Sequence, residues 1–314
     1  MNAGRTYLPD VNRPPGFAMT PKRLLLQTTI EPTHDDWSIA RFSLLKAYLA
    51  GLRGPDGAPL YDVTARDRAA PPGVDDPVLA SLDESDFDAL WLFAVDVGDG
   101  LNARESAAIG RFNDRGGGLL VARDHMDLGC SVCDLGGVGR AHHFHSHNVD
   151  PDEARHVIDD PFTTQILWPN FHSGANGDYQ EIRQAGPVHP LLADPDAPDG
   201  VLRFLPAHPH EGDVSAPSDA PGARVIATGS SIVTGAEFAI AVAFDPQETG
   251  AGPGVAESSF HHFADYNWDP GYGAPSFVTE PPGRGILDNA EAARSTRRYV
   301  ANLAAWLADG RRPN

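Results

Sequence analysis

Residues 116–148 read GGGLLVARDHMDLGCSVCDLGGVGRAHHFHSHN, and the rest of the chain is interpreted outward from this stretch. Three glycines lead into the apolar run Leu119–Ala122, which is typical of a buried parallel strand entered from a tight turn. Arg123, Asp124 and His125 follow at once. In open α/β sheets, ligands bind where the carboxyl ends of the strands meet solvent. We therefore expect a functional region to begin at this strand end.

The sequence on both sides of this stretch alternates strand-like and helix-like segments. Apolar runs predict strands at 23–30, 61–65, 89–95, 119–122, 224–227, 238–244 and 255–260. Apolar spacing and capping residues predict helices from Asp35 or Asp36 to Leu52, from Asn102 through Phe112, and over 288–307, with a short helix within 157–168. This alternation predicts an α/β fold, a three-layer sandwich with a mostly parallel sheet. Residues 1–20 are predicted to form an irregular arm, and 21–310 a single domain with a loop-rich insertion around 126–222.

Composition excludes several classes of partner. The 314 residues include 43 acidic and 24 basic side chains, a net charge of −19, so a phosphate backbone is not an expected partner. No apolar run is long enough to span a membrane, and the first residues lack the apolar segment of a signal peptide. We therefore expect a cytoplasmic protein with a small-molecule partner, and the composition leaves a homo-oligomer open. In that compartment, two cysteines are expected to be ligands or free thiols.

Three features together resemble one known family. A helix leads through the glycines into a strand with a polar end, His189–Pro190 precedes a segment from Phe204 to Glu211, and a strand runs into Ser258–His262 before the last helix. This order resembles the ThuA-like (trehalose-utilisation) group of the class I glutamine amidotransferase-like superfamily, over roughly residues 23–308. The resemblance implies a flavodoxin-like sheet, a site at the carboxyl ends of its strands, and chemistry on a small sugar-related molecule.

The chain departs from that superfamily at the glutaminase nucleophile. A working glutaminase carries Gly-x-Cys-x-Gly at the strand-to-helix elbow, whereas the elbow here reads ARDHM at 122–126. Cys130 comes several residues later and lacks that setting. We therefore expect neither Cys130 nor Cys133 to act as a nucleophile.

The density of histidines points to a metal ion. His143, His145 and His147 alternate, so an extended segment would place them on one side, with neighbours ~7 Å apart and the outer pair ~13 Å apart. Two of them with a distant ligand could therefore hold a divalent metal, zinc foremost, with a position open to water. The remaining candidate ligands are His208, His210, His261 and His262, and strand alternation predicts that only one of the last two faces the sheet end. The alternative is an exposed loop whose histidines bind nothing.

The cysteines offer a competing assignment. Cys130 and Cys133, followed by His143 and His147, have the ligand types and local spacings of a closed Cys₂His₂ zinc site. Such a site would be structural and would clamp a loop of little apolar content. The simpler alternative is a pair of reduced thiols.

Acid/base candidates gather at the predicted strand ends. His34, Asp35 and Asp36 follow the first strand, Asp96 follows the third, and Asp124 and His125 follow the fourth. Parallel strands would bring them to one crevice, where a carboxylate beside an imidazole orients a general base or a metal ligand. We assign catalytic roles to Asp124, His125, His34 and Glu211.

Two functions remain open from the sequence. The first is an enzyme that acts on a small hydroxylated or sugar-derived substrate by metal-assisted or Asp–His acid/base chemistry, of hydrolase or lyase type. The second is a non-catalytic small-molecule-binding or scaffold protein with a degenerate site and a structural zinc.

Overall fold

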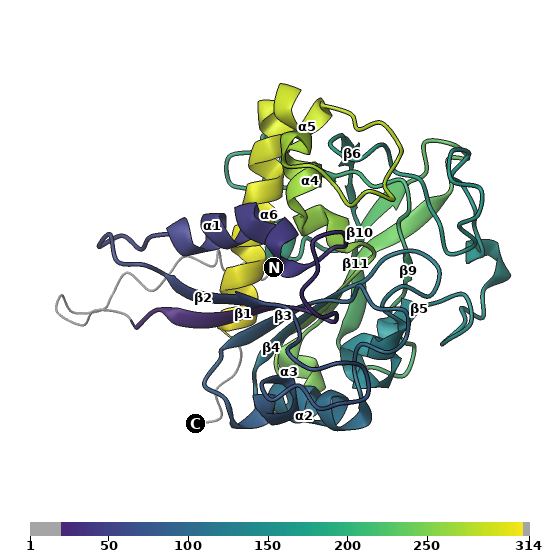
Figure 1. The fold of residues 1–314 in the computed structure, drawn as a ribbon. Helices are drawn as coiled ribbons and strands as arrows, with labels where there is room; N and C mark the ends of the chain where they lie inside the picture. Colours follow the sequence, from purple (N-terminus) through teal and green to yellow (C-terminus); the bar gives the residue numbers. More distant parts are fainter. Residues whose placement is uncertain (1–19, 310–314) are drawn as a thin grey trace.

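A central sheet of eight strands organises the computed structural model, which describes residues 20–309 (Figure 1). The strands lie in the order β2-β1-β3-β4-β12-β11-β10-β7. Their bounds are β1 Lys22–Thr28, β2 Tyr61–Arg66, β3 Ala89–Phe93, β4 Gly118–Ala122, β7 Arg183–Gln184, β10 Ala223–Ser230, β11 Glu237–Phe244 and β12 Gly254–Glu257. The predicted arm lies outside the described residues, except for Thr20.

Five neighbouring strands of this sheet are parallel. β2, β1, β3, β4 and β12 pair in parallel and follow the flavodoxin-like order, in which the second strand lies outside the first. β11, β10 and β7 continue the sheet with antiparallel pairing. The connection from β10 to β11 spans only residues 231–236, which is too short for the crossover that parallel strands require. The mostly parallel sheet predicted from the sequence is therefore confirmed.

Helices cover both faces of the sheet and form the outer layers. The α-helices are α1 Ser43–Gly51, α2 Ala103–Asp114, α3 Pro246–Thr249, α4 Asp265–Trp268, α5 Gly285–Asp288 and α6 Ala290–Ala308. Figure 1 shows α1 and α6 on one face and α2 on the other. Alternate residues of β1 follow this division, because Leu24 packs in the apolar core beneath α1 and α6, whereas Leu25 packs in the core beneath α2. This arrangement confirms the three-layer α/β sandwich.

The long excursion between β4 and β10 consists of short elements. It contains two small antiparallel sheets, formed by β5 (His142–His143) with β9 (Asp213–Val214) and by β6 (Tyr179–Glu181) with β8 (Phe204–Pro206). Short 3₁₀ helices here and elsewhere are η1 Ile39–Phe42, η2 Leu79–Glu84, η3 Cys130–Leu135, η4 Gly137–Ala141, η5 Glu153–Arg155, η6 Pro190–Leu192, η7 Phe260–Phe263 and η8 Pro270–Tyr272. The short helix predicted within 157–168 is wrong, since this segment forms no helix and its one backbone bridge joins Ile158 to Asn170.

Two predicted helix starts have different outcomes. Asn102 caps α2 in a complete capping box with Glu105, as predicted. The expectation that Asp35 or Asp36 caps the first helix is wrong. The carboxylate of Asp265, far along the chain, accepts hydrogen bonds from the backbone amides of Ser43 and Leu44 at 2.9 and 2.7 Å. A cap supplied by a distant segment leaves no local sequence signal.

The glycines that precede β4 are required by close packing. A Cβ atom on Gly118 would lie 2.2 Å from the backbone oxygen of Leu307 in α6, and one on Gly117 would lie 2.4 Å from the ring of Phe112 in α2. The two helical layers therefore approach the start of β4 as closely as a bare backbone permits. Among the described residues, no helix is long and apolar enough to cross a membrane.

We predict opposite effects for two Gly→Ala substitutions. Gly118→Ala should lower the free energy of unfolding by roughly 1–3 kcal/mol, because either β4 or α6 must shift. Gly110→Ala is the control, since Gly110 lies within α2 and a Cβ there meets nothing within 4 Å. This control should raise the free energy of unfolding by about 0.5–1 kcal/mol. Urea unfolding of both variants measures the change in the free energy of unfolding. Equal changes in the two variants would contradict the packing argument.

Candidate functional site

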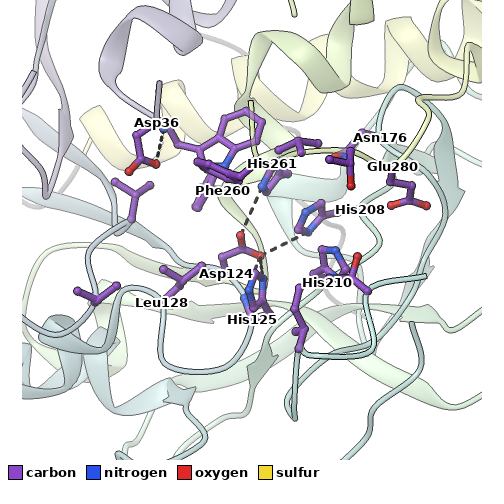
Figure 2. A pocket seen from close by; sticks show the side chains of 18 residues that line it. Asp36, Asp124, His125, Leu128, Asn176, His208, His210, Phe260, His261 and Glu280 are labelled. Atoms are coloured by element: carbon purple, nitrogen blue, oxygen red, sulfur yellow. Dashed lines mark hydrogen bonds and ion pairs between the residues drawn. The ribbon is translucent and has the colours of Figure 1, made fainter. Parts of the chain in front are cut away.

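A cavity of about 380 Å³ lies at the carboxyl edge of the parallel strands (Figure 2). The loops that follow β1, β3, β4 and β12 contribute Trp37, Val95, Asp124 and His261 to its lining. His208 and His210 enter from the segment that follows β8. The cavity therefore occupies the place where open α/β sheets bind ligands.

Asp124 lies at the base of this cavity, and three imidazoles surround its carboxylate. Its side chain is 3% exposed, and its Oδ1 accepts a hydrogen bond from the backbone amide of His125 at 2.8 Å. Nδ1 of His208 lies 3.5 Å from Oδ1, and Nε2 of His261 lies 3.4 Å from Oδ2. The rings of His208 and His261 stack with centroids 3.6 Å apart. Figure 2 shows these side chains converging on Asp124.

The hydrogen bonds of Asn267 fix the proton position on His261. The amide nitrogen of Asn267 donates to the carbonyl oxygen of Ala207 at 2.9 Å, so its Oδ1 must accept. That Oδ1 lies 3.0 Å from Nδ1 of His261, which therefore carries a proton. In the neutral ring, Nε2 then directs a lone pair toward the carboxylate of Asp124. Two electron-rich atoms facing each other need a proton or a metal ion between them.

His210 is oriented by the same type of contact. Its Nδ1 lies 3.2 Å from Oδ1 of Asn170 and 3.3 Å from a carboxylate oxygen of Asp160. Because Asn170 donates its amide to the carbonyl of Ile166, its Oδ1 accepts from Nδ1 of His210. The Nε2 atom of the neutral His210 ring is therefore left with a lone pair.

Burial controls the charge state of this cluster. It opposes ionisation of Asp124, but His125 and His208 outweigh it and hold the pKa of Asp124 well below its ordinary value. Burial also lowers the pKa of His208, and lowers that of His210 to about 3. Burial therefore favours the neutral form of His208 and His210, which is the form of imidazole that metal binding requires. Asp124, His208 and His261 could hold a metal ion, because each offers one ligand atom and these three atoms lie within 4.8 Å of one another.

A second carboxyl group lines the cavity with a different electrostatic character. Burial, together with the charge of Asp160, raises the pKa of Glu280 to about 7. Its Oε2 atom is buried and accepts no hydrogen bond from the described residues. Glu280 can therefore both hold and release a proton near neutral pH. Asp36 also lines the cavity, and burial raises its pKa.

His143, Asp150 and Asp213 form a second buried group that could hold a metal ion. None of the three lines the cavity. His143 was predicted as a ligand, and the structure places it here with two aspartates.

The structure separates His34 from the crevice where the sequence placed it. His34 is exposed and lines a different hollow with Arg41 and Tyr272. The chain after β1 runs outward at His34 and returns to the cavity only at Asp36. Asp96 does not line the cavity either, and its Oδ1 accepts a hydrogen bond from the amide of Gly98.

The three alternating histidines do not converge. β5 ends at His143, and a backbone hydrogen bond from Phe144 to His147 turns the chain. His145 lies beside Trp168, with Nδ1 3.2 Å from its carbonyl oxygen, and His147 is exposed at 3.8 Å from Asp127. The expectation that they share one side of a strand is wrong, because the strand is too short.

The cysteines lie on η3 as free thiols, one buried and one half-buried. Among the described residues, the groups that could hold a metal include neither Cys130 nor Cys133. The Cys₂His₂ clamp with His143 and His147 is therefore not assembled. Burial raises the pKa of the two thiols to about 11 and about 12, so both remain protonated at neutral pH. Protonated thiols are poor nucleophiles.

Glu211 and His262 pair with each other behind the cavity. Nε2 of His262 lies 3.1 Å from Glu211, and Nδ1 lies 3.1 Å from Glu257. Burial opposes protonation of this ring, but the two carboxylates prevail and raise the pKa of His262 to about 10. His262 does not line the cavity and is paired with two buried carboxylates, so the structure does not bring it to the other predicted metal ligands. Glu211 is fully buried and does not line the cavity, so the structure does not bring it beside the other predicted catalytic residues.

Sequence reasoning found part of this site. Asp124, His125, His208, His210 and His261 were all singled out and all line the cavity. The expectation that only one histidine of the final pair faces the sheet end is confirmed, although the pair lies on η7 and not on a strand. The residues that sequence reasoning missed are Asn176, Asn267 and Glu280. Asn176 and Glu280 come from irregular segments and Asn267 from the four-residue helix α4, all too short or irregular for a periodic pattern to identify them.

Comparison with known proteins finds likeness at the level of overall fold. No protein-family model matches the sequence, and no curated protein matches it. A protein described as ThuA-like from Parabacteroides merdae is similar over 92% of this chain and 91% of its own, with a TM-score of 0.48 and 14% identity. The N-terminal domain of mmIFT52 is similar over 91% of this chain and 98% of its own, with a TM-score of 0.45 and 13% identity.

The His262 network predicts a loss of stability at alkaline pH. Its folded pKa of about 10 exceeds the ordinary value of 6.5, so its contribution is complete below about pH 6.5 and is lost as the pH rises to about 10. His262→Gln should lower the free energy of unfolding at pH 7 by roughly 3–5 kcal/mol, because two buried carboxylates lose their cation. It should also flatten the alkaline decline.

Urea unfolding between pH 6 and 10 measures both effects, with His34→Gln as an exposed control that should follow the wild type. If the His262 variant kept the wild-type alkaline decline, the imidazolium assignment would be wrong.

Proposed function

We propose that this chain is an enzyme that acts on a small, uncharged, hydroxylated substrate by metal-assisted or Asp–His acid/base chemistry, without a cysteine nucleophile. The observation that carries this proposal is the buried Asp124 carboxylate, which faces His208 and His261 at the base of a cavity. A sugar-derived substrate is the form that the sequence resemblance to the ThuA-like group implies.

Asp124, His208 and His261 would hold a divalent metal. Their donor set fits such an ion, because a carboxylate and neutral imidazoles are the ligands that zinc takes in catalytic sites. Asn267 would keep Nε2 of His261 available, as outer hydrogen bonds do for metal-bound histidines. When bound, the ion would supply Lewis-acid activation of a water molecule or of a substrate oxygen.

The chain itself would provide the proton transfers. The deprotonated Nε2 of His210 can accept a proton from a substrate hydroxyl or a water molecule in the cavity. Glu280 can donate a proton to a leaving oxygen, because its pKa of about 7 leaves much of it protonated near neutral pH. An acid and a base with pKa values set apart by their surroundings are typical of hydrolytic and eliminating enzymes.

The lining of the cavity selects against anionic substrates. Among the described residues that line it, none is lysine or arginine, whereas Asp36 and Glu280 are both acidic. A phosphate or carboxylate group would find no counter-charge in the protein there. Phe277 and Val97 lie at the cavity and are 58% and 76% exposed, which provides apolar contact for a substituent of the substrate.

The metal assignment predicts which substitutions remove an ion. Asp124→Asn and His261→Ala should each lower the bound metal by about one equivalent, because each removes one of three ligands. His147→Ala is the matched control, since His147 is exposed and lies outside both candidate groups. Elemental analysis of untagged protein after zinc loading at pH 7.5 gives the counts. If every variant retained the full amount of metal, the cavity would not be a metal site, and the Asp–His pair would remain as the reacting group.

The acid assignment predicts the effect of Glu280→Gln on activity. On an uncharged chromogenic ester or glycoside selected by screening, this variant should lower kcat by about 10²–10⁴-fold and abolish the loss of rate above pH 7. Folding provides the control. The folded pKa is raised, so the wild type loses stability as the pH rises from about 4.5 to about 7, and the variant should melt no lower than the wild type at pH 8. An unchanged pH–rate profile would exclude Glu280 as the acid.

A further inference from the structure

The group formed by His143, Asp150 and Asp213, here called the clasp cluster, lies apart from the cavity. His143 comes from β5, Asp213 from the facing strand β9, and Asp150 from the loop that follows β5. The three residues are 7%, 1% and 1% exposed. Each offers one ligand atom, and these three atoms lie within 4.8 Å of one another. The proposed reaction uses none of them.

The ring of His143 is oriented so that one nitrogen can coordinate. Its Nδ1 lies 2.8 Å from the carbonyl oxygen of Asn148, and because a carbonyl only accepts, Nδ1 carries the proton. Nε2 of the neutral ring therefore has a lone pair. This atom lies 3.7 Å from Asp150 Oδ2 and 2.7 Å from the hydroxyl of Ser215.

One of the two carboxylates is already compensated by the protein. Arg155 donates to Asp150 through Nε at 2.5 Å and a terminal nitrogen at 2.8 Å. Asp150 Oδ1 also accepts from the amide of Asp152. Each carboxylate oxygen has two lone pairs, so Oδ2 keeps one free for a further partner.

The other carboxyl group has no guanidinium in contact. Asp213 lies no closer than 3.9 Å to the guanidinium of Arg155, and its oxygens accept no N–H or O–H group of the described residues. Burial and the neighbouring Asp150 carboxylate raise its pKa well above the ordinary value. Arg123 is also nearby and its charge acts on Asp213, but its hydrogen bonds go to the carbonyls of Met126 and His143. A buried carboxylate left without a donor is strongly unfavourable unless it binds a proton or a cation.

We propose that the clasp cluster is a second divalent-cation site, which binds zinc through Nε2 of His143 and the carboxylates of Asp150 and Asp213. Ser215 supplies a hydroxyl beside these ligands. The ion takes the place of a proton between Asp150 and Asp213, and it ties the loop after β5 to β9. Its role is structural, because the cluster is buried and does not reach the cavity. The surrounding excursion has only short elements, so such a tie would contribute directly to its stability.

The competing explanation is a proton shared between Asp150 and Asp213, and substitution with asparagine separates the two. Zinc-loaded full-length protein is analysed for bound metal and for its melting temperature with and without zinc. We expect about two equivalents in the wild type, and about one in each of Asp213→Asn and Asp124→Asn. Zinc should raise the melting temperature of Asp124→Asn, which keeps the clasp cluster intact, more than that of Asp213→Asn. Asp152→Asn is the control and should match the wild type, because its side chain is 54% exposed and lies outside the cluster.

The outcomes distinguish this proposal from the proposed function. If Asp213→Asn binds as much zinc as the wild type and melts at the same or a higher temperature, the pair shares a proton and the proposal is overturned. The proposal is also overturned if the Asp124→Asn variant binds no zinc. This measurement does not depend on whether Asp213→Asn folds. If Asp124→Asn binds one equivalent and Asp213→Asn binds none, the clasp cluster holds the only ion, and the proposed metal in the cavity fails instead.

Discussion

The cost of burying the Asp124 carboxylate shapes the surroundings of the candidate site. Asp124 is the second residue after β4, which lies between β3 and β12 in the sheet, and its side chain is buried there. No lysine or arginine forms an ion pair with it among the described residues, and the side chains within ion-pair distance of its oxygens are imidazoles. A carboxylate whose close partners are titratable rings is a poor stabiliser of a fold, because burial favours the neutral form of a ring such as His208. Its placement is better explained by a ligand that completes the charge.

The long excursion between β4 and β10 brings histidines to the buried Asp124 carboxylate. The parallel strands bring Asp124 and His261 to one edge, but His208 and His210 can reach that edge only from β8. Ser173 fixes this approach, because its hydroxyl and the backbone of His208 exchange hydrogen bonds at 3.0 and 2.9 Å. The same hydroxyl lies 2.9 Å from Glu211, which pairs with the buried His262. The network behind the cavity thus positions a histidine inside it.

The sequence predicts those features that depend on local periodicity. The apolar runs identify the five parallel strands, and the glycines before β4 mark where two helical layers pack closely. Parallel pairing then brings Asp124 to the functional edge, since the carboxyl ends of such strands share one side. The path of loops is not local. His34 and Asp36 are separated by one residue, yet only Asp36 reaches the cavity, because contacts with distant segments decide where the chain turns. Glu280 lies in a Pro- and Gly-rich stretch, and its raised pKa arises from burial against elements remote in sequence.

The two groups that could hold a metal ion, one lining the cavity and one enclosed, lie in different parts of the molecule. The open arrangement is formed by Asp124, His208 and His261, whose side chains line a cavity large enough for a small substrate. The enclosed arrangement is formed by His143 with two aspartates, which have no part in that cavity. Spacing along the chain could not separate them, because each group draws ligands from segments more than 60 residues apart. What separates them is solvent access. A ligand set that opens into a cavity can exchange water for substrate, whereas an enclosed set can only hold its ion and the segments attached to it.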